Sequence, residues 1–190
     1  MSINRTFGEL KAAVLDISPP SNDVGRFLNE AQRKMMKETK RKRTVAVTVL
    51  AGVANVPAEA LFVRGIAYNG YTLGVYPQEN KPDMAYEGTP THFLIQEGVI
   101  YLYPALPSGS IDVVICPAPV EMVLDTVYPT VTDADNALIA YGKFMVYSFN
   151  EDQGAADFWG KRWLSEAAEW VANDNKTIKS TKRVLSRPYV

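Results

Sequence analysis

The hydrophobic pattern of this chain changes period twice, and each change limits the folds that are open to it. Apolar residues recur at helical spacing up to about residue 42, alternate from 44 to about 121, and return to helical spacing after 132. A helix buries a stripe and a strand buries alternate side chains, so one type of element cannot satisfy both patterns. The sequence therefore predicts an α+β protein in which a β block is inserted between two pairs of helices.

Four helices are expected, two on each side of the β block. Thr6 is a good N-cap, and Glu9 three residues later completes the spacing of a capping box. Ser21 and Thr132 are the expected N-caps of the second and third helices. The expected helical ranges are 6–17, 21–42, 132–150 and 155–173.

The third helix is apolar on nearly every side, because Lys143 is the only charge between Ala137 and Phe149. Such a helix has to be covered on nearly every side, which predicts an antiparallel helical bundle. The last helix adds a stripe of tryptophans that suits packing in the same core. Four helices and a small β block offer limited cover, so part of this apolar surface is also expected to face another subunit. The candidate residues of that subunit interface are Phe144, Tyr147, Trp159 and Trp163.

The β block contains about six short strands in about eighty residues, which predicts a small antiparallel sandwich or barrel-like domain. Asn69-Gly70, between two β-rich runs, is a strong signal for a two-residue hairpin. The candidate strands are Thr44–Leu50, Ala60–Tyr68, Tyr71–Tyr76, Thr91–Gln96, Val99–Tyr103 and Ile111–Cys116. The expected divisions are 1–43 and 126–174 for the bundle, 44–125 for the inserted β block and 175–190 for an extended basic C-terminal tail.

A formal net charge of −1 conceals a strong segregation of charge. Residues 33–43 hold seven basic side chains and residues 176–190 hold five, so these two segments contain twelve of the twenty basic residues. Residues 44–175 hold five basic and sixteen acidic residues, a net charge of −11. This distribution excludes a domain of uniformly basic, nucleic-acid-binding composition and leaves open a protein whose charges face different partners.

The first basic segment falls on one face of the second expected helix, and its stripe residues are Arg33, Lys37, Lys40 and Arg41. Three interpretations are open for this stripe: a solvated face, a docking surface for an acidic protein, or a nucleic-acid contact. The segment has no aromatic side chain that could stack on a base, which weakens the last interpretation.

The basic tail carries a few apolar residues among its charges and can therefore become ordered on a partner, although an idle tail is the alternative. Its candidate contact residues are Lys182, Arg183, Leu185, Arg187 and Tyr189.

No catalytic constellation is recognisable. His92 is the only histidine and Cys116 the only cysteine, so no ordinary zinc site is expected and a structural role suits both residues. The carboxylate pairs Asp133/Asp135 and Glu151/Asp152 lie at expected helix ends, which explains them without chemistry. The sequence contains no run of ~18 apolar residues that could span a membrane. The first residues lack the apolar stretch of a secretory signal, and the lone cysteine fits a reducing cytosol. We therefore expect a protein that is not an enzyme and that has no cofactor and no membrane span.

The order of elements and several short phrases resemble the head-to-tail adaptor, or connector, proteins of tailed bacteriophages. No single phrase is diagnostic, and the resemblance lies in their order and spacing. In chain order the phrases are Phe27–Gln32, Val56–Ala58, Leu61–Arg64, Val99–Pro104, Ile111–Val113, Asp135–Gly142 and Ala155–Trp159.

The resemblance implies a virion structural protein located in the phage neck and made in the host cytoplasm. Such adaptors form a ring, commonly of twelve copies, between the portal protein and a tail nozzle or tail-tube component, and genomic DNA passes through the ring without specific binding. The resemblance also implies that residues 176–190 embrace the portal or a neighbouring subunit. The acidic body suits a channel in which DNA must slide. The alternatives are another neck protein, such as a stopper or tail-completion protein, and a nucleic-acid-binding module that uses the basic stripe and tail.

Overall fold

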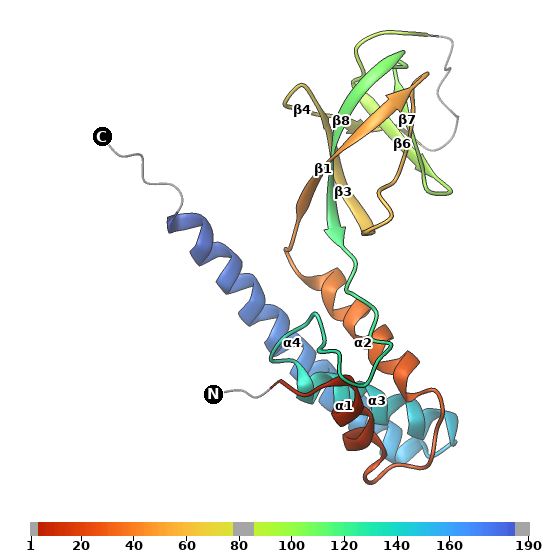
Figure 1. The fold of residues 1–190 in the computed structure, drawn as a ribbon, viewed down its shortest axis with the longest axis vertical. Helices are drawn as coiled ribbons and strands as arrows, with labels where there is room; N and C mark the ends of the chain where they lie inside the picture. Colours follow the sequence, from red (N-terminus) through yellow and green to blue (C-terminus); the bar gives the residue numbers. More distant parts are fainter. Residues whose placement is uncertain (1–3, 78–85, 185–190) are drawn as a thin grey trace. The chain divides into compact units, whose positions relative to one another are not determined.

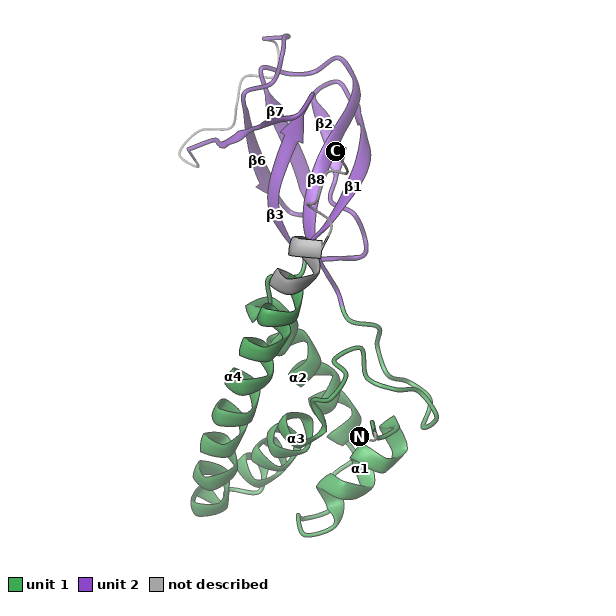
Figure 2. Cartoon of the chain, turned by 90° about the vertical axis from the view of Figure 1, so that its left-hand side faces the viewer, with its two compact units in different colours: residues 1–41, 119–190 green, residues 42–118 purple. Residues whose placement is uncertain are grey.

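The computed structural model describes residues 4–77 and 86–184, with the backbone alone over 179–184. A helical unit comprises residues 1–41 and 119–190, and a β unit comprises residues 42–118 (Figure 2). The described part of the chain contains four helices and one eight-stranded sheet, which confirms the predicted α+β class.

The helical unit contains α1 (Phe7–Leu15), α2 (Val24–Glu38), α3 (Asp135–Phe149) and α4 (Gln153–Val184) (Figure 1). As the apolar composition of α3 requires, this helix packs against the other three. At Gly142 the approach is so close that a Cβ atom would lie 2.6 Å from a methyl group of Val14 on α1.

The predicted capping box of α1 is confirmed. The Thr6 amide donates to the Glu9 carboxylate at 2.7 Å, and the Glu9 amide donates to the Thr6 hydroxyl at 3.4 Å. The first of these bonds lowers the pKa of Glu9.

The second helix is shorter than the sequence predicts. It begins at Val24 rather than after Ser21, and it ends at Glu38 rather than near residue 42. Thr39 adopts an extended backbone while its hydroxyl donates to the carbonyl of Met36 at 2.9 Å. This local bond competes with helix continuation, so the residues after Thr39 lie outside the helix.

The third helix starts at Asp135, three residues after the predicted N-cap. Asp133 has a φ of 59° and interrupts the helical geometry, and the Thr132 carbonyl accepts a hydrogen bond at 2.8 Å from the indole of Trp170. The N-cap position is instead Ala134, which makes no side-chain capping hydrogen bond.

The last helix is longer than predicted, because α4 continues to Val184 instead of ending near Asn173. An extended conformation for residues 175–184 was the wrong expectation. Loss of apolar periodicity does not end a helix that contains no proline, and bonds from Arg41 to Asp174 and from the Lys40 amide to Asn175 support the segment. The rest of the predicted tail, 185–190, lies outside the described residues.

The described part of the β unit has eight strands rather than six. In chain order they are β1 (Arg43–Leu50), β2 (Val53–Asn55), β3 (Ala60–Tyr68), β4 (Tyr71–Thr72), β5 (Gly74–Val75), β6 (His92–Gln96), β7 (Val99–Tyr103) and β8 (Ser108–Pro117). Sequence analysis missed the short β2, which follows an Ala51-Gly52 turn with positive φ at both positions. The Asn69-Gly70 hairpin is confirmed, with Tyr68 paired to Tyr71.

The sheet is nearly closed into a barrel. Its strand order is β4-β3-β8-β1-β2-β7-β6-β5, so the two edge strands are consecutive in the chain and only Leu73 separates them. The predicted single strand Tyr71–Tyr76 is therefore split: β4 pairs with β3, whereas β5 pairs with β6, and that pair is parallel. The buried Leu73 side chain joins the interior cluster, which explains why the strand is interrupted there.

The interior of the barrel is apolar. Its buried cluster consists of Val49, Ala54, Ile66, Leu73, Phe93, Ile100, Leu102, Leu106, Ile111, Val113 and Ile115. Apart from Leu73 and Leu106, which lie between strands, these side chains come from alternating positions of the strands, as the period of two predicts. Among the described residues, no helix of either unit is long and apolar enough to cross a membrane.

Candidate interaction surface

The loop of residues 119–131, which brings the chain back from β8 to the helices, is fixed to α2 by a buried amide. Asn29 donates to the carbonyl of Met122 at 2.9 Å and accepts from the amide of the same residue at 2.8 Å. Gln32, one turn further along α2, accepts from the Thr130 amide at 2.8 Å. Both side chains are buried, so their bonds to the loop are shielded from water.

The start of α1 holds the same loop from another direction. The amides of Phe7 and Gly8 belong to the first helical turn, where they have no partner within the helix, and they donate to the carbonyls of Val127 and Asp125 at 2.8 and 2.9 Å. At Gly8 a Cβ atom would lie 3.0 Å from the Asp125 side chain, so the close approach depends on glycine. The 119–131 loop is therefore a fixed structural feature although it has no regular secondary structure.

This fixed loop exposes a group of large apolar side chains. The exposed residues, which we call the loop surface, are Val120, Val123, Leu124 and Tyr128. Two acidic residues lie among them: Glu121 pairs with Arg33 at 3.7 Å, and Asp125 pairs with Lys11 at 2.5 Å. Both pairs are largely exposed and contribute little to stability.

A groove of about 590 Å³ lies between α2 and α4. It is mostly apolar, and small alanine side chains on α4 leave it open. Leu164 projects from α4 with 67% of its surface exposed. The lining residues of this α2/α4 groove are Lys34, Met35, Lys37, Glu38, Trp163, Leu164, Ala167, Ala168, Val171 and Ala172.

A polar cluster fixes one rim of the groove. The buried Tyr141 hydroxyl donates to Glu30 at 2.6 Å and accepts from Lys34 at 2.7 Å, and Lys34 pairs with Glu30 at 3.0 Å. The hydrogen bond from Tyr141 lowers the pKa of Glu30. Burial opposes the charge of Lys34, but its bonds to Tyr141 and Glu30 outweigh this effect and raise its pKa. Burial, followed by the bond to Glu30, raises the pKa of Tyr141.

The predicted basic stripe is divided by the structure. Arg33 faces the loop, Lys37 lines the groove, and Lys40 and Arg41 follow the end of α2. Arg41 makes hydrogen bonds of 2.5 to 3.1 Å to Asp174 of the same chain and lies 5.7 Å from the ring centre of Trp170. Arg41 of the stripe thus pairs with an acidic residue of α4 in the same chain.

The aromatic residues proposed for a subunit interface hold the helices of one chain together. Trp163 is buried, 4.9 Å from Tyr141 between ring centres, and Phe144 is half-buried at 6.0 Å from the same ring. Tyr147 donates to the carbonyl of Ile17 at 2.6 Å. Lys143 lies 4.6 Å from the ring centre of the half-buried Trp159, and burial lowers the pKa of this lysine.

A sequence profile of the SU10 adaptor protein family matches residues 5–182. This chain belongs to the SU10 adaptor protein family. No curated protein matches it. The family is one of structural bacteriophage adaptor proteins and is not a known class of enzyme, in agreement with the expectation from sequence.

The structure shows what one of the phrases that resemble the adaptor family does in this chain. In Phe27–Gln32, the apolar positions are core residues of α2, whereas Asn29 and Gln32 bind the loop. Sequence analysis missed this polar role, because the bonded residues are more than ninety positions apart. The signal that could have found it was two amides on the apolar face of an amphipathic helix.

The structure describes only some of the residues that are predicted to contact the portal. Lys182 and Arg183 belong to the backbone of α4. Leu185, Arg187 and Tyr189 lie outside the described residues.

The isolated polar residues show no reactive arrangement. His92 is exposed, with Nδ1 3.0 Å from the Thr91 hydroxyl, and Cys116 is buried.

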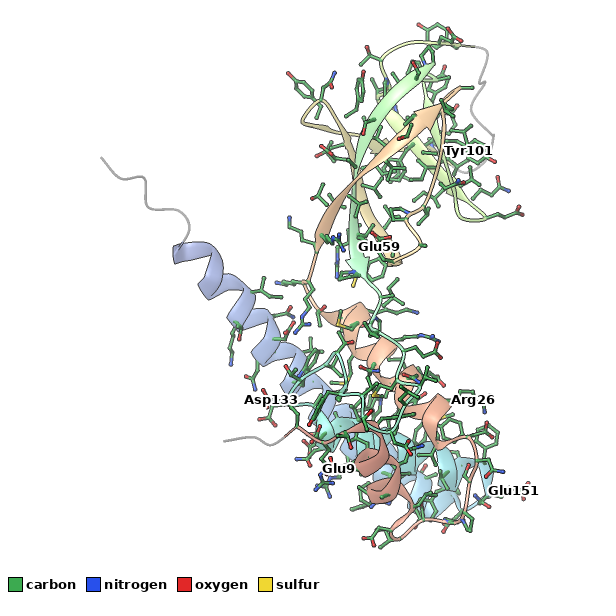
Figure 3. The ribbon with its side chains drawn as sticks, in the orientation of Figure 1. Glu9, Arg26, Glu59, Tyr101, Asp133 and Glu151 are labelled. Carbon is green, nitrogen blue, oxygen red and sulfur yellow. The ribbon has the colours of Figure 1, made fainter. Side chains whose placement is uncertain are left out.

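Two of the carboxylates at the helix ends have structural partners. Asp135 accepts from the Arg5 amide, and its burial raises its pKa. Asp152 accepts from the Ala155 amide at the start of α4. Figure 3 shows Asp133 and Glu151 near opposite ends of α3. Within residues 4–77 and 86–178, no three histidine, cysteine or acidic side chains gather as a metal site.

Proposed function

We propose that this SU10-family adaptor is a subunit of a ring, commonly of twelve identical copies, that joins the portal protein to a tail nozzle or tail-tube component in the virion neck. The family match over residues 5–182 is the observation that carries the proposal. It is supported by the large apolar side chains that the helical unit exposes, since such surface is typical of proteins that assemble.

The contacts between subunits are proposed to involve the face of α3 and α4 around Phe144, Tyr147, Trp159 and Trp163. Phe149 and Phe158 are exposed close to these residues along the same two helices. An apolar face of this kind can be extended by a neighbouring copy, because burial of exposed aromatic surface favours association.

The portal is proposed to bind the C-terminal segment through Lys182, Arg183, Leu185, Arg187 and Tyr189. Charged residues allow electrostatic attraction to an acidic surface, and the apolar residues anchor the segment. The acidic body, with its net charge of −11 over residues 44–175, suits a channel wall, because a wall without a basic surface does not hold the phosphates of DNA.

The test measures binding of the full chain to the portal protein of the same virus by native mass spectrometry and electron microscopy. We expect a ring of adaptor copies on the portal. The double variant Lys182→Glu/Tyr189→Ala is expected to weaken portal binding at least about tenfold, a loss of ~1.4 kcal/mol. The matched control Lys161→Glu/Tyr71→Ala makes the same changes at exposed positions elsewhere and is expected to bind normally.

Absence of any complex between the wild-type chain and the portal would contradict the proposed function. Equal binding by the two double variants would contradict only the role of the C-terminal segment. Strong DNA binding at physiological salt would instead support a nucleic-acid-binding module.

A further inference from the structure

We propose that the α2/α4 groove of one copy receives the loop surface of a second copy, in a head-to-tail contact. This inference rests on the proposed function insofar as that function requires identical copies side by side. The loop surface is Val120, Val123, Leu124 and Tyr128, and the groove is the one that Leu164 and Lys37 line.

The loop and the groove lie on opposite faces of α2. Successive residues of a helix are separated by about 100°. The mean direction of the α2 residues that bind the loop is therefore roughly 170° from the mean direction of those that line the groove. Asn29, Gln32 and Arg33 contact the loop, and the groove residues of α2 are Lys34, Met35, Lys37 and Glu38. Figure 2 shows α2 between α4 on one side and the loop on the other.

This arrangement prevents a chain from filling its own groove with its own loop. Asn29, Gln32 and the start of α1 hold the loop in place on the far side of the helix. A second copy has no such restriction. A contact between two different surfaces of identical subunits is heterologous, and it produces a closed ring when the rotation between copies closes.

The two surfaces match in polarity. The groove is concave and mostly apolar, with alanines that leave space, and the loop presents four large apolar side chains within nine residues. Because the loop is held by buried hydrogen bonds before any contact forms, little conformational entropy would be lost when it enters a groove.

The charges also match. Residues 119–131 contain Glu121 and Asp125 and no basic residue, which gives a net charge of −2. The groove rim carries two lysines, Lys34 and Lys37, against one acid, Glu38. Lys34 is already bound to Glu30, whereas Lys37 makes no ion pair with the described part of the chain. The loop acids pair within their own chain, but these exposed pairs are weak, so a loop acid of a second copy is a suitable additional partner for Lys37.

The experiment uses cysteine cross-linking between separately purified full-length chains. One chain carries Leu124→Cys and the other Leu164→Cys, at positions that are 65% and 67% exposed, and affinity tags distinguish them. They are mixed at roughly millimolar concentration, where a contact with a Kd near 1 mM is half occupied, and oxidised mildly. The native Cys116 is buried and does not compete.

We expect the mixture to give at least about ten times more cross-linked heterodimer than either chain gives homodimer, because a disulfide requires Cα atoms within about 7 Å. Leu50→Cys, mixed with Leu164→Cys, is the matched control, since Leu50 is 69% exposed in the β unit. We also expect Leu164→Asp to remove association while the circular dichroism spectrum is retained. Leu50→Asp should keep association.

Three results would overturn the inference. Predominant Leu164→Cys homodimers would indicate a symmetric contact, and cross-linking of Leu164→Cys to a portal or tail protein would assign the groove to that partner. Cross-linking no greater than with Leu50→Cys would exclude the contact. If rings on the portal were nevertheless visible, only this inference would fail. A cross-link without any ring would retain the contact and contradict the proposed ring.

Discussion

The two units of this protein hold themselves together by different means. Among the described residues, the four buried polar or charged side chains, Asn29, Gln32, Thr39 and Lys143, all belong to the helical unit. The buried cluster of the β unit is entirely apolar. The helical unit also fixes its long connecting loop through side-chain amides, whereas the barrel uses its backbone ladder.

The difference follows from where each backbone finds its hydrogen-bond partners. Strands bond to neighbouring strands, so the ladder itself sets which residues face each other, as along the whole length of β1 against β8. A helix satisfies its backbone internally and leaves nothing to bind a neighbouring loop except its ends and its side chains. A helical unit that must fix a loop therefore needs specific buried polar residues, and a barrel does not.

The largest effect is expected from a cavity in the barrel. Ile111→Ala should lower the free energy of unfolding by about 2–5 kcal/mol, because Ile111 is fully buried and its methyl groups fill the apolar interior. Urea unfolding followed by far-UV circular dichroism measures the loss. The control Leu50→Ala, at an exposed position, should change the stability by less than about 0.5 kcal/mol. A loss below about 1 kcal/mol for Ile111→Ala would show that the barrel does not depend on tight apolar packing.

The corresponding change in the helical unit removes a buried amide without creating a cavity. Asn29→Leu should cost about 2–4 kcal/mol, because the amide and carbonyl of Met122 both lose their partner. Tryptophan fluorescence is the suitable probe, since all three tryptophans lie in α4. Asn55→Leu, at an exposed position of the barrel, is the matched control and should be nearly neutral. An unchanged or higher stability for Asn29→Leu would break the comparison between the units.

A smaller, pH-dependent effect is expected at the Glu30–Tyr141–Lys34 cluster. Tyr141→Phe should cost about 1 kcal/mol at pH 7, because the bond that lowers the pKa of Glu30 is lost. A carboxyl with a lowered folded pKa contributes stability above its unfolded pKa, about 4.3, and loses that contribution as pH falls through the folded pKa.

The difference between wild type and Tyr141→Phe should therefore shrink as the pH falls from 7 to 3 in thermal unfolding experiments. The exposed Tyr71→Phe serves as the control and should show no such trend. A difference that stays constant with pH would mean that the Tyr141 hydroxyl does not act through Glu30.

Sequence reasoning found what local patterns encode. The capping box at Thr6, the hairpin at Asn69-Gly70 and the limits of β3 and β7 all depend on residues close together in the chain, and each was found. The errors occurred where a distant residue decides the outcome. The α4 helix continues past Asn173 with support from Arg41, and the single strand predicted at Tyr71–Tyr76 divides because β4 and β5 pair with different neighbours.

The candidate site was predicted less well than the fold. The predicted stripe of Arg33, Lys37, Lys40 and Arg41 depends on a helix that runs to residue 42. Because α2 ends at Glu38, Lys40 and Arg41 lie outside the helix. The loop surface and the α2/α4 groove were not predicted, because they depend on which side of α2 the loop and α4 occupy. That choice is made by bonds between residues about a hundred positions apart.

The sequence by itself determined that this chain has helical and β parts, an acidic body and basic segments, since period and charge are properties of the chain alone. Only the tertiary structure decided that the barrel nearly closes at Leu73 and that Asn29 and Gln32 place an apolar loop opposite an apolar groove. The physical reason is that one sequence leaves many pairings open for a buried amide or a strand edge. The folded chain selects the pairings that satisfy nearly all of its buried polar groups at once.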